Sequence, residues 1–282
     1  MTTPAQVAAA GQLACLLEVS APKPGNVSPE RHFHDTRYED FLASAVAIGP
    51  ALAQAHVQPL GATIRQAVED TLRWTRSNTN LGIVLLLAPL ARAALRNGEK
   101  LRAELHQVLN ETTVADASEV YAAIRRARPG GLGQSASEDV AGAPSVTLRE
   151  AMGLAAERDA VAREYVTDFA LTFETGVPAL QQVRREGLAW TDAVVETYLT
   201  LLETGPDTHI SRKLGPQEAA TISRRAAEVR RAGGTRTPGG RTALAELDRE
   251  LRDPRNRRNP GSTADLTCAA LFVVILEGGW DR

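Results

Sequence analysis

Four segments of the chain place polar side chains beside turn-forming residues, immediately before a stretch with helical periodicity. These segments are Pro22–Thr36, Ser77–Gly82, Gly205–Gly215 and Asn256–Leu266. A helix N-terminus presents unpaired backbone N–H groups and the positive end of the helix dipole, and both favour phosphate. Several such ends that meet at one end of a helical bundle would hold a polyphosphate. The spacing therefore predicts an anion site formed by loops at helix N-termini.

The candidates for phosphate binding are the cationic, amide, hydroxyl and glycine residues of these segments. Arg212 suits a bidentate contact with phosphate oxygens, and Lys213 acts as a point charge. The two prolines and Gly25 of the PKPG turn stiffen the chain and let its backbone approach a ligand, although such a turn also serves as a plain connector. The full set is Lys23, Gly25, Asn26, Asn78, Thr79, Asn80, Arg212, Lys213, Gly261 and Ser262.

An imidazole and several carboxylates in the same segments suit metal binding or proton transfer. His34 and Asp35 stand together just before Thr36, where they could bind Mg²⁺, hold its waters or move a proton; Asp35 could instead only assist helix capping. Asp207 adds an acidic group for a metal, with a solvated loop as the alternative. Asp265 ends a capping-box pattern, which already gives it a structural explanation.

The elements that must position these residues are predicted to be helices. Four patterns with capping-box spacing each precede an apolar-periodic run. They are Thr36–Glu39, Asp116–Glu119, Thr147–Glu150 and Ser262–Asp265. Aromatic residues make up only 4% of the chain, whereas sheets favour aromatic and β-branched side chains. We expect an all-α, single-domain multi-helix bundle over residues 1–282, with Arg128–Pro144 as a surface or active-site loop and Gly233–Gly240 as a mobile loop.

Composition and charge limit the classes of partner. The net charge is −2, so no global basic field indicates nucleic acid or a membrane surface. Residues 212–258 nevertheless carry thirteen Lys and Arg against six Asp and Glu, which favours anions there. No stretch reaches the roughly 20 apolar residues of a membrane span, and the first cationic residue is Lys23, so no signal peptide is expected. Cys15 and Cys268 lie in apolar patterns and are expected to be buried. These features favour a cytoplasmic protein.

The motifs, taken in order, resemble the triphosphoribosyl-dephospho-CoA synthase family. The resemblance starts with Glu18 in the first predicted helix and the PKPG turn at Pro22–Gly25, followed by a His-Asp element. It continues with an NT-x-x-G segment at Asn78–Gly82 and a DT…R segment at Asp207–Arg212, and it ends with PGSTADL at Pro260–Leu266. Together the motifs cover nearly the whole chain.

Members of that family are all-helical and use ATP as a ribosyl donor. The resemblance implies attack by the 2′-hydroxyl of 3′-dephospho-CoA on the ribose carbon that carries adenine, which releases adenine. It implies catalytic roles for His34, Asp35 and Asp207, with His34 as the proton donor to adenine. It also implies Mg²⁺ bound by some of Glu18, Asp35, Asp207 and Asp265 to neutralise the triphosphate. A homodimer is left open.

Departures from the family pattern leave the identity of the acceptor substrate undecided. Asn80 and Leu81 stand where the synthases usually carry His-Lys, and His34 and Asp35 are adjacent rather than separated by one residue. One alternative is a phosphoribosyl-type transfer in another cofactor pathway, such as tetrahydromethanopterin biosynthesis. A second is an HD-type phosphohydrolase, whose metal site needs a separate upstream His and a distant Asp. A third is a non-catalytic helical scaffold.

Overall fold

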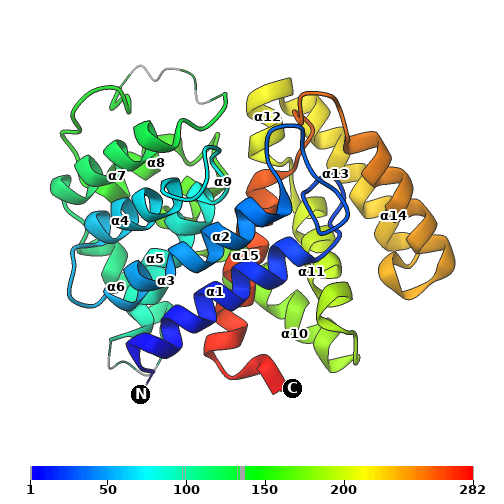
Figure 1. Ribbon diagram of the computed structural model, residues 1–282, viewed down its shortest axis with the longest axis horizontal. Coiled ribbons are helices and arrows are strands. Elements are labelled where there is room, and N and C mark those ends of the chain that lie inside the picture. The colour runs from blue at the N-terminus through cyan, green and yellow to red at the C-terminus, as the bar shows by residue number, and fades with distance from the viewer. Residues whose placement is uncertain (1, 97, 99, 132, 134–136, 282) are drawn as a thin grey trace. The chain divides into compact units, whose positions relative to one another are not determined.

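The computed structural model describes residues 2–96, 98, 100–131, 133 and 137–281, which pack into two compact units (Figure 1). The first unit comprises Met1–Cys15 and Glu39–Ala170, and the second comprises Leu16–Tyr38 and Leu171–Arg282. Helices dominate both units, and the described residues contain no strand beyond an isolated bridge between Ser28 and Arg31. The all-α prediction is confirmed, while a single domain over residues 1–282 stays a prediction.

The first unit is assembled around one almost wholly buried helix, α5. Its apolar residues pack against the neighbouring helices α3, α4, α6 and α9, and α4 lies along α7. The helices of this unit are most of α1 (Pro4–Ser20), α2 (Tyr38–Ala47), α3 (Gly49–Ala53), α4 (Leu60–Leu72), α5 (Leu81–Ala94), α6 (Leu101–Asn110), α7 (Val114–Ala127), α8 (Leu148–Ala155) and α9 (Ala160–Val166). Residues 132 and 134–136 of the predicted Arg128–Pro144 loop lie outside the described residues.

The second unit has an equally buried centre, α15, which packs against α10, α11, α12 and a π-helical turn at Leu171–Gly176. Helix α13 packs on α11, α12 and α14, and α13 and α14 run side by side in Figure 1. The helices are α10 (Val177–Arg185), α11 (Trp190–Thr204), α12 (Thr208–Leu214), α13 (Pro216–Arg231), α14 (Pro238–Leu251) and α15 (Gly261–Leu276), with 3₁₀ turns at Gly234–Arg236 and Gly279–Asp281.

The predicted capping boxes are partly confirmed. Thr147 and Glu150 form the box that opens α8. The box predicted at Asp116–Glu119 is wrong by three residues, because Thr113 caps α7 and Asp116 is the fourth and last residue of that box. Asp116 also accepts a hydrogen bond from the Gly61 backbone at 2.8 Å. The Asp116 carboxylate therefore contacts two helices: it accepts from Gly61 of α4 and closes the capping box of α7.

The box predicted at Ser262–Asp265 is also wrong. Helix α15 begins at Gly261 with Pro260 as its N-cap, and Pro260 has no side-chain group that accepts a hydrogen bond. Ser262 lies within the first turn instead, where its hydroxyl bonds to Thr208 of α12. The serine therefore joins two helices rather than capping one.

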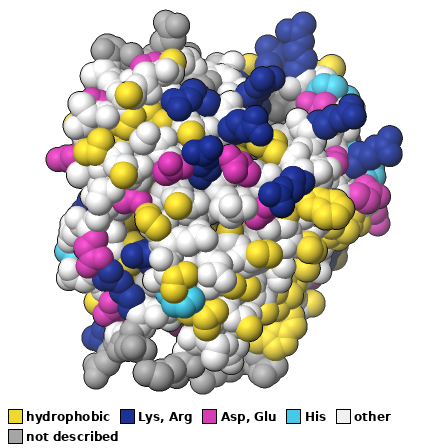
Figure 2. All heavy atoms as spheres, turned by 60° about the vertical axis from the view of Figure 1, so that its left-hand side comes forward, with side chains coloured by type: hydrophobic (Ala, Val, Ile, Leu, Met, Phe, Trp, Pro, Cys, Tyr) yellow, Lys and Arg dark blue, Asp and Glu magenta, His cyan; other side chains and the backbone are white. Residues whose placement is uncertain are grey.

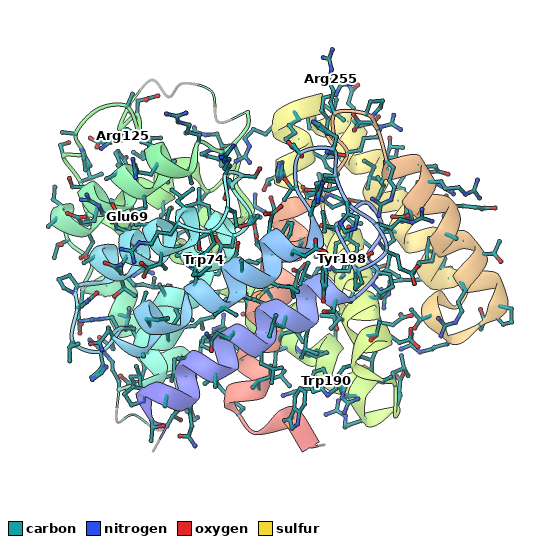
Figure 3. The ribbon with its side chains drawn as sticks, viewed as in Figure 1. Glu69, Trp74, Arg125, Trp190, Tyr198 and Arg255 are labelled. Atoms are coloured by element: carbon teal, nitrogen blue, oxygen red, sulfur yellow. The ribbon has the colours of Figure 1, made fainter. Side chains whose placement is uncertain are left out.

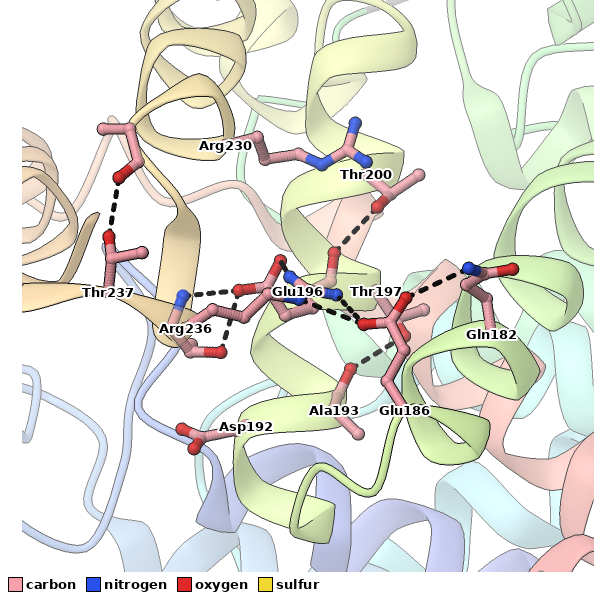
Figure 4. A network of polar contacts seen from close by, with 12 residues as sticks. Gln182, Glu186, Asp192, Ala193, Glu196, Thr197, Thr200, Arg230, Arg236 and Thr237 are labelled. Atoms are coloured by element: carbon pink, nitrogen blue, oxygen red, sulfur yellow. Dashed lines mark hydrogen bonds and ion pairs between the residues drawn. The ribbon is translucent and has the colours of Figure 1, made fainter.

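The segment Gly233–Gly240 is not the mobile loop that its composition predicts, because a buried carboxylate of α11 fixes it (Figure 4). Glu196 accepts the backbone N–H of Thr235 at 2.5 Å and the Thr235 hydroxyl at 2.8 Å. Its other oxygen pairs with Arg236 at 2.6 Å. Thr237 then accepts the Gly240 N–H and caps α14. The glycines give the backbone freedom that this close approach requires.

Burial and surface features agree with the composition. Cys15 and Cys268 are both buried, as expected from their apolar surroundings. On the face shown in Figure 2, Lys and Arg side chains gather toward the upper part with acidic side chains among them. Within the described part of the chain, no helix has the length and apolar character to cross a membrane.

Candidate functional site

The PKPG turn is a junction of the second unit. Gly25 has a φ of +75°, which favours glycine. Its N–H donates to Asp248 of α14 at 2.8 Å, and its carbonyl accepts from the Asn259 amide at 2.9 Å. A Cβ at this position would lie 2.8 Å from the Cβ of Leu251. Gly25 therefore connects α14 and the segment before α15, and its backbone is engaged by the protein rather than by an approaching ligand.

The Asn26 side chain is also engaged in hydrogen bonds within the protein. Its amide nitrogen donates to the Tyr198 hydroxyl at 3.0 Å and to the Pro24 carbonyl at 3.2 Å, and its amide oxygen accepts from Asn259 at 3.0 Å. Tyr198, labelled in Figure 3, donates to the same Pro24 carbonyl at 2.8 Å. Burial, with Asp207 nearby, raises the pKa of Tyr198 well above its usual value. The structure therefore gives Asn26 a scaffolding role in place of the predicted phosphate contact.

Lys23 and Glu18 form a buried ion pair. The Lys23 ammonium lies 3.0 Å from Glu18 Oε1, and both side chains are at most 5% exposed. The remaining ammonium donors bond the carbonyl of Glu18 and, at 3.2 Å, the carbonyl of Ala21. A buried ammonium must be paired because its desolvation costs several kcal/mol. Lys23 and Glu18 are thus paired with each other in this structure, and their roles as phosphate and metal ligands stay predictions.

Asp207 is buried and engages four hydrogen-bond donors. One oxygen accepts the N–H groups of His209 and Ile210 at 2.9 and 3.0 Å, which caps α12. The other accepts the N–H and hydroxyl of Thr263 in α15 at 2.8 and 2.7 Å. Burial raises the pKa of this carboxyl, and the bonds from Thr263, Ile210 and His209 counteract the rise. Asp207 thus closes the starts of two helices, which leaves its oxygens little capacity for the predicted metal.

Gly261 and Ser262 complete this junction between α12 and α15. The Ser262 hydroxyl lies 2.8 Å from the Thr208 hydroxyl and accepts the His209 N–H at 3.0 Å. The His209 ring lies against Gly261 so closely that a Cβ there would be 2.1 Å from Nδ1. Both residues therefore serve packing and capping, rather than presenting open donors to a phosphate.

His209 is a residue that the sequence reasoning missed. Burial, together with the neighbouring cations Lys213 and Arg212, lowers the pKa of its imidazole to about 3. The ring is therefore neutral at physiological pH, inside one of the four polar segments. Its position directly after Asp207-Thr208 in a helix-start segment was the available sequence cue.

An accessible polar cluster forms where the segment 28–37, the end of α12 and the segment 252–260 meet. His34 and Asp35 are more than half exposed, with His34 Nε2 3.8 Å from Asp35 Oδ2. The Asn256 amide lies 3.0 Å from His34 Nδ1, and Lys213 Nζ is 3.5 Å from the Asn256 carbonyl. Burial and Arg212 lower the pKa of Lys213, while nearby carboxylates including Asp35 raise it. The structure thus brings His34, Asp35 and Lys213 together, and Arg212 lies near Lys213 on α12.

The segment 252–260 borders this cluster and is held by Asp253. Its carboxylate accepts the backbone N–H groups of Arg255, Arg257 and Arg258 at 2.9, 2.6 and 2.9 Å. These hydrogen bonds keep the pKa of Asp253 below its usual value despite burial. The Arg255 side chain, labelled in Figure 3, is exposed. The segment therefore presents guanidinium groups on a fixed backbone.

Asn78, Thr79 and Asn80 belong to the first unit and lie at the start of α5. Asn78 is exposed, and its side-chain oxygen accepts the Leu81 N–H at 3.1 Å. Thr79 and Asn80 are buried: the hydroxyls of Thr79 and Ser44 lie 2.5 Å apart, and Asn80 donates to Thr71 at 3.1 Å. Of the three predicted phosphate ligands, Asn78 alone faces solvent.

Comparison with known proteins agrees with this set of motifs. Residues 4–282 match the CitG family, described as ATP:dephospho-CoA triphosphoribosyl transferase. The chain belongs to this family. The resemblance drawn from the sequence is confirmed.

Curated relatives of the family match shorter stretches. The chain is 34% identical over 117 residues to a Pseudomonas savastanoi pv. phaseolicola protein, covering 42% of this chain and 38% of that one. It is 35% identical over 98 residues to a Pseudomonas putida protein, covering 35% and 34%. Both carry the name 2-(5''-triphosphoribosyl)-3'-dephosphocoenzyme-A synthase. The match thus spans less than two fifths of these relatives' length.

A solved structure of the family matches more broadly. It is a crystal structure from Archaeoglobus fulgidus, named as a triphosphoribosyl-dephospho-CoA synthase, with a TM-score of 0.66 and 28% sequence identity. The match covers 84% of this chain and 99% of that one.

The carboxylates predicted to hold Mg²⁺ in this CitG-family chain do not form a ready-made metal site. Among the residues described, no three His, Cys, Asp or Glu side chains are arranged to hold an ion. Glu18 is paired with Lys23 and Asp207 is surrounded by donors, while Asp265 is half-buried in α15. Mg²⁺ commonly uses one or two carboxylates plus substrate phosphates and water. The exposed Asp35 beside Lys213 fits that mode of binding.

Proposed function

We propose that this protein is a triphosphoribosyl transferase that joins the ribose of ATP to 3′-dephospho-CoA. The observation that carries the proposal is the cluster of His34, Asp35, Arg212 and Lys213 within a chain of the CitG family. A cluster with one imidazole, one exposed carboxylate and two cations supplies the groups that ribosyl transfer from a polyphosphate donor requires.

The reaction forms one bond and breaks another at the same carbon. The 2′-oxygen of the acceptor bonds to C1′ of the ATP ribose as the bond from C1′ to N9 of adenine breaks. The acceptor hydroxyl releases its proton to water and adenine takes up one proton as it leaves, so the number of protons is unchanged. Arg212 and Lys213 hold phosphate oxygens of the donor, and Asp35 stabilises positive charge that develops on the ribose. His34, more than half exposed, donates the proton to adenine.

Magnesium fits this proposal as part of the Mg-ATP substrate. Mg²⁺ would neutralise charge on the triphosphate, and Asp35 is the carboxylate best placed to hold its waters. The buried groups Asp207, Tyr198 and Asn26 keep the segments that carry these side chains in position. They act by positioning and do not contact substrate.

The test is to incubate the purified protein with Mg-ATP and 3′-dephospho-CoA and to follow adenine by chromatography and the CoA product by mass spectrometry. Adenine together with a triphosphoribosyl mass increment supports the proposal. Adenine without a modified CoA indicates a different acceptor, and a pterin precursor is then the next acceptor to assay. Neither product, with Mg-ATP binding also absent, contradicts ribosyl transfer from ATP.

Matched variants locate the chemistry. We expect Asp35→Asn and His34→Gln to slow adenine release by about 100-fold each, the usual scale for losing a positioned acid or base. His56→Gln serves as the control because His56 is an exposed histidine of the other unit. Full activity in both Asp35 and His34 variants would remove these residues from the reaction.

The cytoplasmic location and the homodimer stay predictions. Cell fractionation tests the first, and light scattering of the purified chain tests the second.

A further inference from the structure

One residue of the segment 252–260, Asn256, contacts two members of the polar cluster at once. Its side-chain amide nitrogen lies 3.0 Å from His34 Nδ1, and its backbone carbonyl accepts from Lys213 Nζ at 3.5 Å. His34 belongs to the segment 28–37 and Lys213 to α12, and all three residues are part of the second unit. Asn256 therefore joins two elements that are far apart in the sequence.

The backbone of Asn256 has a conformation that few residue types adopt. Its φ is +50°, in the left-handed region that asparagine tolerates better than most other residues with a side chain. Such a conformation persists only where the surroundings fix it. Here the Asn256 N–H donates to the Asp253 carbonyl at 3.0 Å, and the Asp253 carboxylate accepts the N–H groups of the flanking residues Arg255 and Arg257. The turn at Asp253 thus holds the residue that carries the amide.

The contact with Asn256 determines which nitrogen of the His34 ring carries the proton. An amide nitrogen donates and does not accept, so Nδ1 accepts and the neutral ring has its proton on Nε2. Nε2 is also the nitrogen on the side of Asp35, 3.8 Å from Asp35 Oδ2. A half turn of the amide would present its oxygen to the Nδ1–H of a charged ring. Asn256 can therefore hold either form of the ring in the same orientation.

We propose that Asn256 is a positioning residue whose amide orients the His34 ring, so that Nε2 is the nitrogen that gives a proton to the departing adenine. This inference rests on the proposed function, which makes His34 the proton donor. The proton moves from Nε2 to adenine as the bond from C1′ to N9 breaks, and the imidazole afterwards regains a proton from water. Asn256 does not contact the substrate and acts only through His34.

The first test measures adenine release by Asn256 variants with Mg-ATP and 3′-dephospho-CoA. We expect Asn256→Gly to lower kcat about tenfold, the factor that corresponds to one hydrogen bond of about 1.4 kcal/mol, with KM for Mg-ATP unchanged. Glycine adopts the positive φ and keeps the carbonyl that Lys213 contacts, so this variant removes only the amide. Asn256→Ala removes the amide and adds backbone strain. A loss confined to Asn256→Ala, with Asn256→Gly fully active, overturns the inference, because strain then accounts for the effect.

A double-mutant cycle with His34 separates positioning of the ring from a general structural effect. His34→Ala should slow adenine release about 100-fold. Adding Asn256→Gly should slow it no further, because the amide then has no ring to orient. Independent effects of the two substitutions would multiply to about 1000-fold, and that outcome contradicts a role of Asn256 through His34.

Nitrogen NMR of the His34 ring at one fixed pH tests the hydrogen bond without relying on activity. We expect Nδ1 to be unprotonated in the wild-type protein and protonated in Asn256→Asp, because a carboxylate accepts a hydrogen bond and cannot donate one. The same spectrum in both proteins overturns the inference. The matched control is Asn110→Ser, since the Asn110 amide lies 2.8 Å from His106 Nε2 in the other unit and should affect neither the His34 spectrum nor kcat.

The outcomes distinguish the inference from the proposed function on which it rests. An active wild-type protein whose kcat is unchanged in Asn256→Gly overturns the role of Asn256 and leaves the proposed function intact. A wild-type protein that releases no adenine overturns both, whatever the His34 spectrum shows.

Discussion

The carboxylate of Asp207 accepts both the backbone N–H and the hydroxyl of Thr263, at 2.8 and 2.7 Å. The same carboxylate caps α12 through His209 and Ile210. One buried side chain thus fixes the beginnings of two helices that are distant in sequence. Because Arg212 and Lys213 lie on α12, their position depends on this junction as well.

Replacing Asp207 should therefore reduce stability as well as activity. In Asp207→Ala, four buried donors lose their acceptor, and we expect the free energy of unfolding to fall by about 3 kcal/mol. Urea unfolding measures the loss. The control is Asp192→Asn, since Asp192 pairs with Arg241 at a partly exposed site and should change stability by less than about 1 kcal/mol. An Asp207→Ala protein with wild-type stability and no activity would instead give Asp207 a direct chemical role.

Alanine substitutions at Gly25 and Gly187 distinguish the cost of backbone strain from the cost of steric overlap. Both have positive φ, +75° and +83°, but a Cβ at Gly25 would meet Leu251 at 2.8 Å whereas a Cβ at Gly187 meets nothing within 4 Å. We expect Gly187→Ala to cost about 1 kcal/mol of unfolding free energy. Gly25→Ala should cost roughly 2–4 kcal/mol, because overpacking adds to the strain. Equal costs in thermal or urea unfolding would show that Leu251 gives way.

The Lys23 and Glu18 pair distinguishes a structural lysine from a phosphate ligand. Lys23→Met leaves a buried carboxylate without its partner, and we expect a loss of about 3–5 kcal/mol. Adding Glu18→Gln should restore a large part of that loss, since no buried charge then remains. Urea unfolding of the wild-type protein and of the single and double variants gives the free energies for a double-mutant cycle. If Lys23 were a direct phosphate ligand, Lys23→Met would weaken triphosphate binding without a comparable loss of stability.

The sequence predicts the helical architecture well because helices depend on local patterns. Thr147 and Glu150 cap α8 as the spacing indicates, and His34 and Asp35 come near Lys213 from a second of the polar segments, while their chemical roles stay predictions. The family membership follows from the same motifs. These predictions need only the residue types and their order in the chain.

Tertiary contacts that no local pattern contains account for the errors. The Asn26 amide has the chemistry to bind phosphate, but in the structure it is hydrogen-bonded to Tyr198 and Asn259. Gly233–Gly240 has the composition of a mobile loop, but Glu196 of α11 binds Thr235 and fixes the segment. In both cases the competing partner is distant in sequence, so spacing within a segment could not reveal that the polar group is already engaged.

The buried imidazole of His209 predicts how the stability of the protein depends on pH. Its pKa is about 3 in the folded protein, against 6.5 for an ordinary histidine, because burial and the cations Lys213 and Arg212 disfavour the imidazolium. The unfolded chain therefore binds a proton that the folded chain does not, and stability present above pH 6.5 is lost progressively as the pH falls toward 3. One such proton gives a slope of about 1.4 kcal/mol per pH unit. Urea unfolding between pH 4 and 8 should show a shallower slope for His209→Gln than for wild type, while the exposed-site control His56→Gln should follow wild type. Parallel curves for all three proteins would mean that the His209 ring takes up its proton without unfolding the α12 junction.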